Sequence, residues 1–311
     1  MITSKKNQRF LRLPPVTIKR DSFQGLDGMF GYTTDDVETQ REITHICDPD
    51  MQRIYGECNS FLDYDVLSAV NSDIETVVLP SQINEFVQNG KIFSEHENYS
   101  NIFGIYISKL VKNSYDDGNN DFVLDLENVP LFDHLFLCLK GRGTKNDIDI
   151  IVNGNVGSNF AKSSMFLQVT LNGDADDSFG FNSNYLTAHI KGNVKDYFGI
   201  VSNHMHALIE GNVGDKLGNS FYSNFVVGGD VGDNFGYHTQ ELESVVRGKI
   251  GSNFLSCATD ERVVVREDQV SPSLQKIDNI IVKGKTAMDL LYIKKYLEFE
   301  KRMQKKRGIR K

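Results

Sequence analysis

Aspartate is the residue type whose spacing in this chain most suggests chemistry. It recurs at intervals of 18 or 19 residues in the middle of the sequence, at Asp177, Asp196, Asp215 and Asp233. Carboxylates brought into line could hold a row of Ca²⁺ ions, which each take about 6–8 oxygen ligands. Alternatively, each aspartate caps its own turn by accepting backbone N–H groups. Serine fills the two outer places of the column, Ser158 and Ser252, and caps a turn without charge. We therefore predict turn-capping acids and no metal.

Two weaker candidates are a histidine pair and an acidic doublet. His204 and His206 would point to the same side of a strand, as a metal site requires, but their nearest partner is His189 in the preceding repeat. A pair of surface histidines is the simpler interpretation. Asp176 and Asp177 could act as the two carboxylates of a glycosidase, yet the turns are too short and uniform to build a cleft. The sequence has no GxxxxGK[ST] loop, GxSxG elbow or HExxH motif, so we predict no catalytic residue and no cofactor.

An internal repeat of 18 or 19 residues must position these side chains. Each copy begins with a glycine and has an apolar residue two positions later and a Phe or Leu six positions later. A coil of this length is too short for a strand–helix–strand crossover, which needs about 30 residues. Its alternating segments predict strands, so stacked coils would form a parallel β-solenoid with continuous apolar columns inside. The leading glycines are Gly154, Gly173, Gly192, Gly211, Gly229 and Gly248. The predicted core ladder is Phe160, Phe179, Phe198, Leu217, Phe235 and Phe254.

The repeat divides the chain into three regions. Residues 120–282 are predicted to form the mainly β solenoid, with about six to eight coils, and residues 1–119, which lack the repeat, an α+β cap or small domain. Residues 283–311 are predicted to form a basic C-terminal helix. This helix would begin at a capping box made by Thr286 and Asp289 and would run to about Lys306. We expect it to plug the open end of the solenoid, where unpaired strand edges invite aggregation.

Charge is spread unevenly along the chain. The formal net charge is −8, yet residues 1–20 carry +6 and residues 283–311 carry +8, which leaves −22 on the middle of the chain. An acidic body argues against broad nucleic-acid coverage, because phosphate repels it. The basic ends could bind RNA, an acidic partner or the protein's own body, or they could be solvated tails. The possible partner-binding residues are Lys301, Arg302, Lys305, Lys306 and Arg307.

Composition narrows the class of protein. The 311 residues are 40% hydrophobic and 24% charged, as in ordinary soluble globular proteins, and no apolar run reaches the ~18 residues of a membrane span. The first residues lack the apolar core of a secretory signal. The four cysteines, Cys47, Cys58, Cys138 and Cys257, have the spacing of neither a metal knuckle nor a disulfide framework. We therefore expect a cytoplasmic protein with reduced thiols.

Two copies of the repeat resemble a known family. Residues 192–199, GNVKDYFG, and 211–218, GNVGDKLG, are similar to the repeat of the GXGXG β-helix domain. This domain forms the C-terminal part of the glutamate synthase large subunit and one of the subunits of formylmethanofuran dehydrogenase. The resemblance covers about residues 141–266. The family's Gly-Gly turn is replaced here by Ser183-Asn184 and Ser202-Asn203, and asparagine tolerates the positive φ that such a turn needs.

The resemblance implies scaffolding, because the family's β-helix packs against catalytic domains and brings no catalytic residues. Our leading hypothesis is a non-catalytic structural or protein-interaction subunit of a larger assembly, with other protein subunits as partners. A second is an accessory subunit of a glutamate-synthase-like or formylmethanofuran-dehydrogenase-like enzyme. A third is a nucleic-acid adaptor that works through the basic termini, and a fourth is a carbohydrate-active solenoid.

Overall fold

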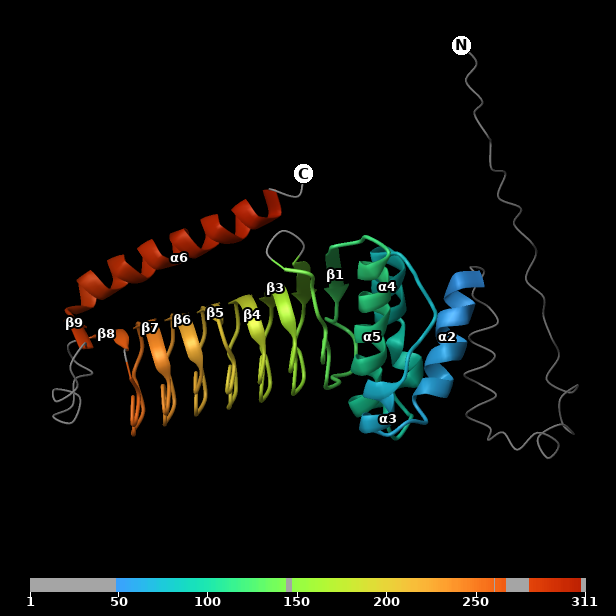
Figure 1. Ribbon diagram of the computed structural model, residues 1–311, viewed down its shortest axis with the longest axis horizontal. Coiled ribbons are helices and arrows are strands. Elements are labelled where there is room, and N and C mark those ends of the chain that lie inside the picture. The colour runs from blue at the N-terminus through green and yellow to red at the C-terminus, as the bar shows by residue number, and fades with distance from the viewer. Residues whose placement is uncertain (1–48, 144–146, 260, 267–279, 309–311) are drawn as a thin grey trace, which may run out of the picture. The chain divides into compact units, whose positions relative to one another are not determined.

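The repeat forms a parallel β-solenoid in the computed structural model, which describes residues 49–143, 147–259, 261–266 and 280–308 (Figure 1). Nine strands pair in sequence order in one parallel sheet, which confirms the predicted fold class. The strands are β1 (Asp121–Asp125), β2 (Ile148–Asn153), β3 (Met165–Asn172), β4 (Asn184–Ile190), β5 (His206–Ile209), β6 (Phe221–Val227), β7 (Gln240–Val246), β8 (Arg262–Arg266) and β9 (Ile280–Lys283).

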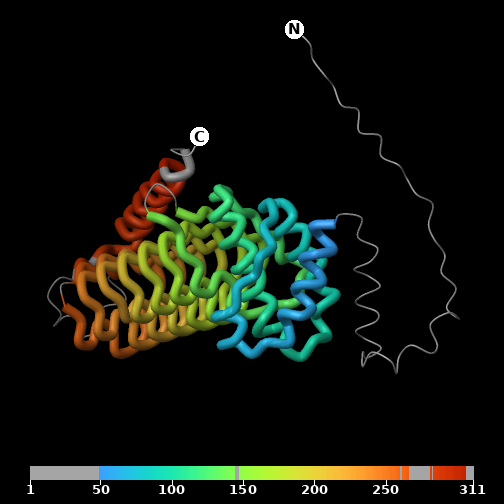
Figure 2. Tube along the Cα trace, turned by 45° about the vertical axis from the view of Figure 1, so that its right-hand side comes forward, coloured from blue at the N-terminus to red at the C-terminus, as the bar shows by residue number. Residues whose placement is uncertain are grey.

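Equivalent positions of successive coils pair with one another. In the sheet, Val169 pairs with Ala188 and Ala188 with Ala207, so the register follows the 19-residue spacing of the sequence. On another side of the coils, the apolar residue two positions after each glycine forms single parallel bridges, as between Val156 and Ala175. Figure 2 shows the coils stacked in this way. Backbone hydrogen bonds therefore run along the stack on more than one side of each coil.

The phenylalanine column lies inside the solenoid. The ring centroids of Phe160 and Phe179 are 4.8 Å apart, and those of Phe179 and Phe198 are 5.2 Å apart. Their planes lie within 28° of each other, which is a stacked arrangement of aromatic rings. All six members of the predicted core ladder, from Phe160 to Phe254, are buried. The column therefore supplies a large apolar surface that only stacked coils can cover.

The leading glycines are required by close approach of the coils. A Cβ atom on Gly173 would lie 2.2 Å from the carbonyl oxygen of Gly154, and one on Gly248 would lie 2.1 Å from that of Gly229. No side chain fits at such distances. Among the six leading glycines, only Gly154 has a positive φ, of 104°. The glycine column is therefore mainly a packing requirement between neighbouring coils.

The corners of the coils contain left-handed residues that are not glycine. We expected Asn184 and Asn203 to take the positive φ of the turn before the strand. The structure instead places it one residue later, at Tyr185 (φ 53°) and His204 (φ 54°). The reason is that Asn184 and Asn203 pair with each other across coils in extended conformation, so the chain turns only after them. A left-handed residue also occurs at Val201 (φ 58°), where a β-branched side chain makes it costly.

Helices cover the first coil. The described part of residues 1–119 holds α2 (Pro49–Phe61), α3 (Val66–Asn71), α4 (Pro80–Gln88), the 3₁₀ helix η2 (Gly90–Phe93) and α5 (Tyr99–Asp116). Residues 49–119 contain no strand, so the β part of the expected α+β segment is not found there. Helix α4 contacts β1, where Asn84 Oδ1 accepts the backbone N–H of Asp125 at 2.8 Å. Helix α5 packs Phe103 against Phe132, which follows β1, with ring centroids 5.1 Å apart.

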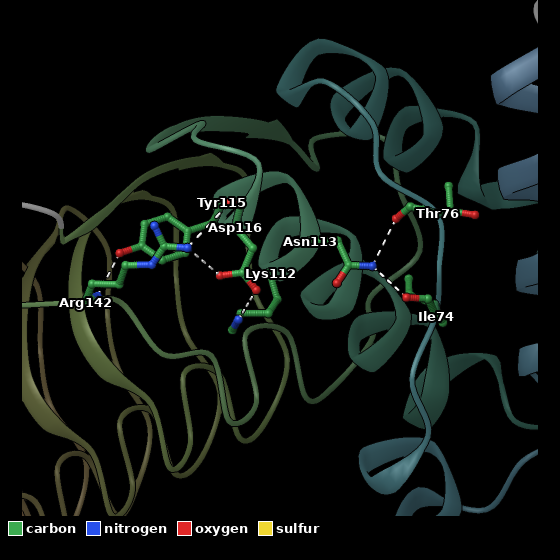
Figure 3. Close-up of polar contacts among 7 residues, drawn as sticks. All are labelled: Ile74, Thr76, Lys112, Asn113, Tyr115, Asp116 and Arg142. Carbon is green, nitrogen blue, oxygen red and sulfur yellow. Dashed lines mark hydrogen bonds and ion pairs between the residues drawn. The ribbon is translucent and has the colours of Figure 1, made fainter.

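Polar contacts at the end of α5 join the helices to the solenoid (Figure 3). Asn113 Nδ2 donates to the carbonyl oxygens of Ile74 and Thr76 at 2.7 and 3.1 Å, which holds an extended segment against α5. The guanidinium of Arg142 pairs with Asp116 at 3.1 Å. Burial alone would raise the pKa of Asp116, but the cations of Lys112 and Arg142 outweigh it and hold that pKa below its usual value.

The C-terminal helix lies along the sheet and does not plug the end of the solenoid. Helix α6 (Lys285–Gly308) follows β9 and runs back over the strands toward β3 (Figures 1 and 2). It contacts β6 and β8, and the backbone carbonyl of Met303 lies 3.5 Å from Gln168 in β3. The prediction was wrong because the outward side of these strands is itself apolar and needs a cover. Within the described residues, none of the helices combines the length and the apolarity needed to cross a bilayer.

Candidate functional site: helix α6 on the sheet

An apolar column runs across the outward side of the sheet. The strand register aligns five residues of successive coils in this column: His189, Leu208, Val226, Val245 and Val264. A solvent-facing column in a sheet is usually polar, but every member of this one is buried. The strands therefore have apolar residues on both faces, and the outward face needs a second layer.

Helix α6 supplies that layer. Its inner face places Phe299 and Met303 against Leu208 and Val226 of the column, with Tyr292 and Tyr296 at the edges. Near the start of the helix, Met288 and Leu291 pack against Val245 and Val264. Burial raises the pKa of Tyr292 to about 12, with the nearby Glu210 acting in the same direction. The inner face thus meets the sheet in two apolar clusters, which together cover several coils.

His189 is the polar member of the column and lies between two carboxylates. Its Nε2 is 2.8 Å from Glu210 Oε1, and its Nδ1 is 2.7 Å from Glu300 Oε1 on α6, while only 5% of its side chain is exposed. The hydroxyl of Tyr296 also donates to Glu210, at 3.3 Å. Each ring nitrogen of His189 therefore lies at hydrogen-bond distance from a carboxylate oxygen, one from Glu210 beside β5 and one from Glu300 on α6. The cluster ties the helix to the sheet at a defined register.

Two ion pairs extend the same contact. Lys295 Nζ lies 3.2 Å from Glu243 in β7, and Arg247 Nε lies 2.6 Å from Asp289 on the helix. The Arg247 guanidinium also lies 5.6 Å from the centroid of the Tyr292 ring. These charges lie at the edge of the apolar contact, where they favour one orientation of the helix more than they add stability.

The opposite side of α6 has an exposed apolar stripe. Leu290 is 65% exposed, Ile293 53% and Leu297 51%. The spacing of three and four residues places them on one face of the helix. We call these three residues the outer stripe. Of the predicted partner-binding residues, Lys301, Arg302 and Lys305 are exposed on α6 beyond it, whereas the side chains of Lys306 and Arg307 lie outside the described residues.

The aspartate column forms a hydrogen-bonded ladder between coils. Asp177 Oδ1 accepts the backbone N–H of Asp196 at 3.0 Å, and Asp196 and Asp215 do the same for the next member of the column at 2.8 Å. We expected each acid to cap its own turn, but in stacked coils the N–H group within reach belongs to the next coil. Asp133, which precedes the first leading glycine, accepts from the backbone N–H of Ser158 in the same way at 2.7 Å. In the ranges that the structure describes, no three His, Cys, Asp or Glu residues are grouped as metal ligands.

The two histidines of the predicted pair have different environments. His204 lies at a left-handed corner, where its ring stacks between Tyr185 and Tyr222 with centroid distances of 4.5 and 5.1 Å. His206 begins β5. The pair therefore does not share one face of a strand. The third histidine, His189, lies under α6 in the outer column, so it does not join them.

The two aspartates of the acidic doublet also have different partners. Asp176 pairs with Lys195 at 2.5 Å, whereas Asp177 belongs to the aspartate ladder. Asp176, Lys195 and Glu127 line a groove of about 660 Å³ beside the segment that follows β1. Asp177 does not line this groove, so the doublet does not present two carboxylates to one ligand.

Comparison of this chain with protein-family models, with curated protein sequences and with solved structures gives no match in any of the three. The function therefore has to be argued from the geometry of the chain itself. Sequence reasoning missed His189 and Glu300 as partners because 111 positions separate them. A signal for the docked helix was present in the sequence: the runs at 207–209, 225–227 and 263–265 are continuously apolar, which is typical of strands buried on both faces.

Proposed function

We propose that this protein is a non-catalytic structural or protein-interaction subunit of a larger assembly. The observation that carries the proposal is the outer stripe of α6. It displays three aliphatic side chains on a helix whose opposite face is fixed by Phe299, Met303 and His189. A surface that is both apolar and rigid favours association, because little conformational entropy is lost when a partner binds.

Two further observations support this proposal. The carboxylates of the repeat are occupied by backbone N–H groups of neighbouring coils, as at Asp196 and Asp215, which is a structural use of acidic residues. The exposed cysteines Cys138 and Cys257 are free thiols, which agrees with the cytoplasmic location that we propose for the protein.

The resemblance to the GXGXG β-helix domain stays a prediction. It would make the partner a catalytic component of a glutamate-synthase-like or formylmethanofuran-dehydrogenase-like enzyme. Genes for such components beside the gene for this chain would support that version of the proposal, and consistent separation from them would count against it.

The test is recovery of the tagged full-length protein from its native host at low and at high salt. We expect a defined set of proteins to remain bound at high salt, because apolar contacts resist screening. If nucleic acid co-elutes and is lost as salt rises, the basic termini are the functional region and the subunit proposal is wrong. Recovery of the protein alone under both conditions would also contradict the proposal.

A further inference from the structure

The geometry points to a specific kind of partner for α6: an amphipathic α-helix with an acidic border. We propose that its apolar face covers the outer stripe and that its carboxylates pair with Lys294 and Lys301. This inference rests on the proposed function and adds the chemistry of the partner to it. It is carried by three features of α6, namely the exposure of the stripe, the basic residues beside it and the fixed inner face.

The stripe is not explained by packing within the described part of this chain. A helix that packs against a sheet on one side normally has a polar opposite side. Helix α6 meets the sheet through Met288, Phe299 and Met303, yet Leu290 and Leu297 on the other side are at least half exposed. Leu290 and Leu297 are seven residues apart and span about 10.5 Å along the helix, the length that a crossing helix covers.

The residues beside the outer stripe include exposed lysines that can pair with the carboxylates of a partner. The side chain of Lys294 is 72% exposed, and its carboxylate neighbour is Glu298, whose oxygen lies 4.0 Å away on the helix surface. Such an exposed pair contributes little, so an approaching carboxylate can replace it. Lys301 and Lys305 are also exposed. Lys295, by contrast, faces the sheet and pairs with Glu243, which leaves the outward lysines as the charges that select a partner.

A second copy of the chain fits this surface poorly. A symmetric antiparallel pairing of two α6 helices, centred between Leu297 and Glu298, would place Lys294 of one copy opposite Lys301 of the other. Like charges at that distance disfavour association. A partner with Glu or Asp at those positions replaces the repulsion by attraction.

An anionic membrane also fits poorly. Helices that lie on membranes bury a large apolar face in the lipid, whereas the outer stripe consists of three aliphatic side chains. The region between residues 21 and 282 carries a net charge of −22, and its Leu208 and Val226 pack against the inner face of α6. That charge would repel anionic lipid headgroups. A protein helix contacts the stripe more narrowly and avoids most of this repulsion.

The experiment uses the full chain and three fluorescent peptides of about 20 residues, long enough to span α6 contacts as a helix. The first has Leu and Ile at helical spacing bordered by Glu, the second has the same apolar residues bordered by Lys, and the third is a scrambled form of the first. Binding is measured by fluorescence anisotropy. We expect the Glu-bordered peptide to bind and the other two to bind at least about tenfold more weakly.

Two sets of variants locate the binding. The double substitution Ile293→Ser and Leu297→Ser should weaken binding of the Glu-bordered peptide by at least about tenfold. The charge reversal Lys294→Glu with Lys301→Glu should reduce binding of the Glu-bordered peptide and increase binding of the Lys-bordered one. Leu67→Ser is the matched control, because Leu67 is 72% exposed but lies on α3. Thermal unfolding monitors folding in every variant, and the substituted side chains are all exposed.

The inference is wrong if the stripe variants bind the Glu-bordered peptide as the parent does. It is also wrong if they abolish self-association in sedimentation experiments, or binding to phosphatidylserine vesicles, because the occupant is then a second copy or a membrane. If the native-host partners survive the Ile293→Ser and Leu297→Ser change, the subunit proposal stands and this inference fails. If the parent recovers no partner at all, the subunit proposal itself fails.

Discussion

The two apolar columns of the solenoid are built on different principles. The inner column repeats nearly the same residue, from Phe160 to Phe254, once in every coil. The outer column changes from His189 through Leu208 to three valines, and it is covered by one helix that occurs once in the chain. The inner column therefore makes all coils alike, whereas the outer column makes each coil distinct. The comparison shows that departures from the repeat, rather than the repeat itself, specify where α6 binds.

Removing an aromatic ring from the inner column should have the largest effect on the free energy of unfolding. Phe179→Ala deletes a fully buried ring that stacks on both Phe160 and Phe198. We expect the free energy of unfolding to fall by about 3–5 kcal/mol, because the cavity lies between coils that cannot collapse independently. Urea denaturation followed by circular dichroism measures this change. Tyr237→Ala, which removes an exposed ring, is the control and should change little.

Truncation of a phenylalanine in the helix should have a smaller and more local effect on stability. Phe299→Ala removes the ring that packs on Leu208 and Val226, and we expect a loss of about 2–3 kcal/mol. Hydrogen exchange should increase in α6 while the strands stay protected, because the inner column is intact. Equal loss of protection in the strands would show that the two columns are one cooperative unit, and would remove the distinction between them.

Substitution of His189 tests whether the contacts of this polar residue with two carboxylates stabilise the fold. His189→Gln leaves Glu210 and Glu300 without the imidazole ring that contacts both of them. We expect a loss of about 1–3 kcal/mol. Adding Glu300→Gln should recover part of it, because one of the two repelling charges is then absent. A double-mutant cycle measures the coupling between the two residues, and additive losses would show that the contacts are independent.

The smallest effect on stability is expected at a corner of one coil, outside both apolar columns. Val201 is left-handed and exposed, while the equivalent residue of the preceding coil is Asn182. Val201→Asn should raise the free energy of unfolding by about 1 kcal/mol, since asparagine adopts this conformation more easily than a β-branched residue. The thermal midpoint should rise accordingly. A fall would mean that the Val201 side chain has a packing role that its exposure does not reveal.

The predictability of the two columns from sequence differs for a physical reason. Fixed spacing identified the inner column, since Phe160, Phe179 and Phe198 recur at 19 residues and a stack converts equal spacing into contact. The outer column is buried by a helix that follows, in the sequence, all the strands it covers. The repeat pattern does not predict which face of the sheet this helix packs against. The direction of the aspartate bonds could not be predicted either. It requires knowing that the N–H of Asp196 lies beside Asp177 of the neighbouring coil.

The candidate site was predicted only in part. The expected helix, which runs to about Lys306, agrees with the observed Lys285–Gly308, but the expected capping box is wrong. The helix begins before Thr286, with the N–H of Met288 bonded to the carbonyl of Gly284 at 2.9 Å, and Asp289 pairs with Arg247 instead. Helical spacing places Met288 and Leu290 on different sides of the helix, but both sides are apolar, so the sequence does not decide which one is buried. Only the sheet decides that Met288 is buried and Leu290 exposed.

The docked helix also bears on how this solenoid can change in length over evolution. Repeat proteins commonly gain or lose units by duplication or deletion, since each unit contacts only its neighbours. Helix α6 is about 36 Å long, and its contacts with Gln168, His189 and Val264 are spaced to match particular coils. One additional coil would shift the strands beneath it by about 4.8 Å and separate Glu300 from His189. The helix therefore acts as a ruler that fixes the number of coils, and any variant with a different number needs a correspondingly altered helix.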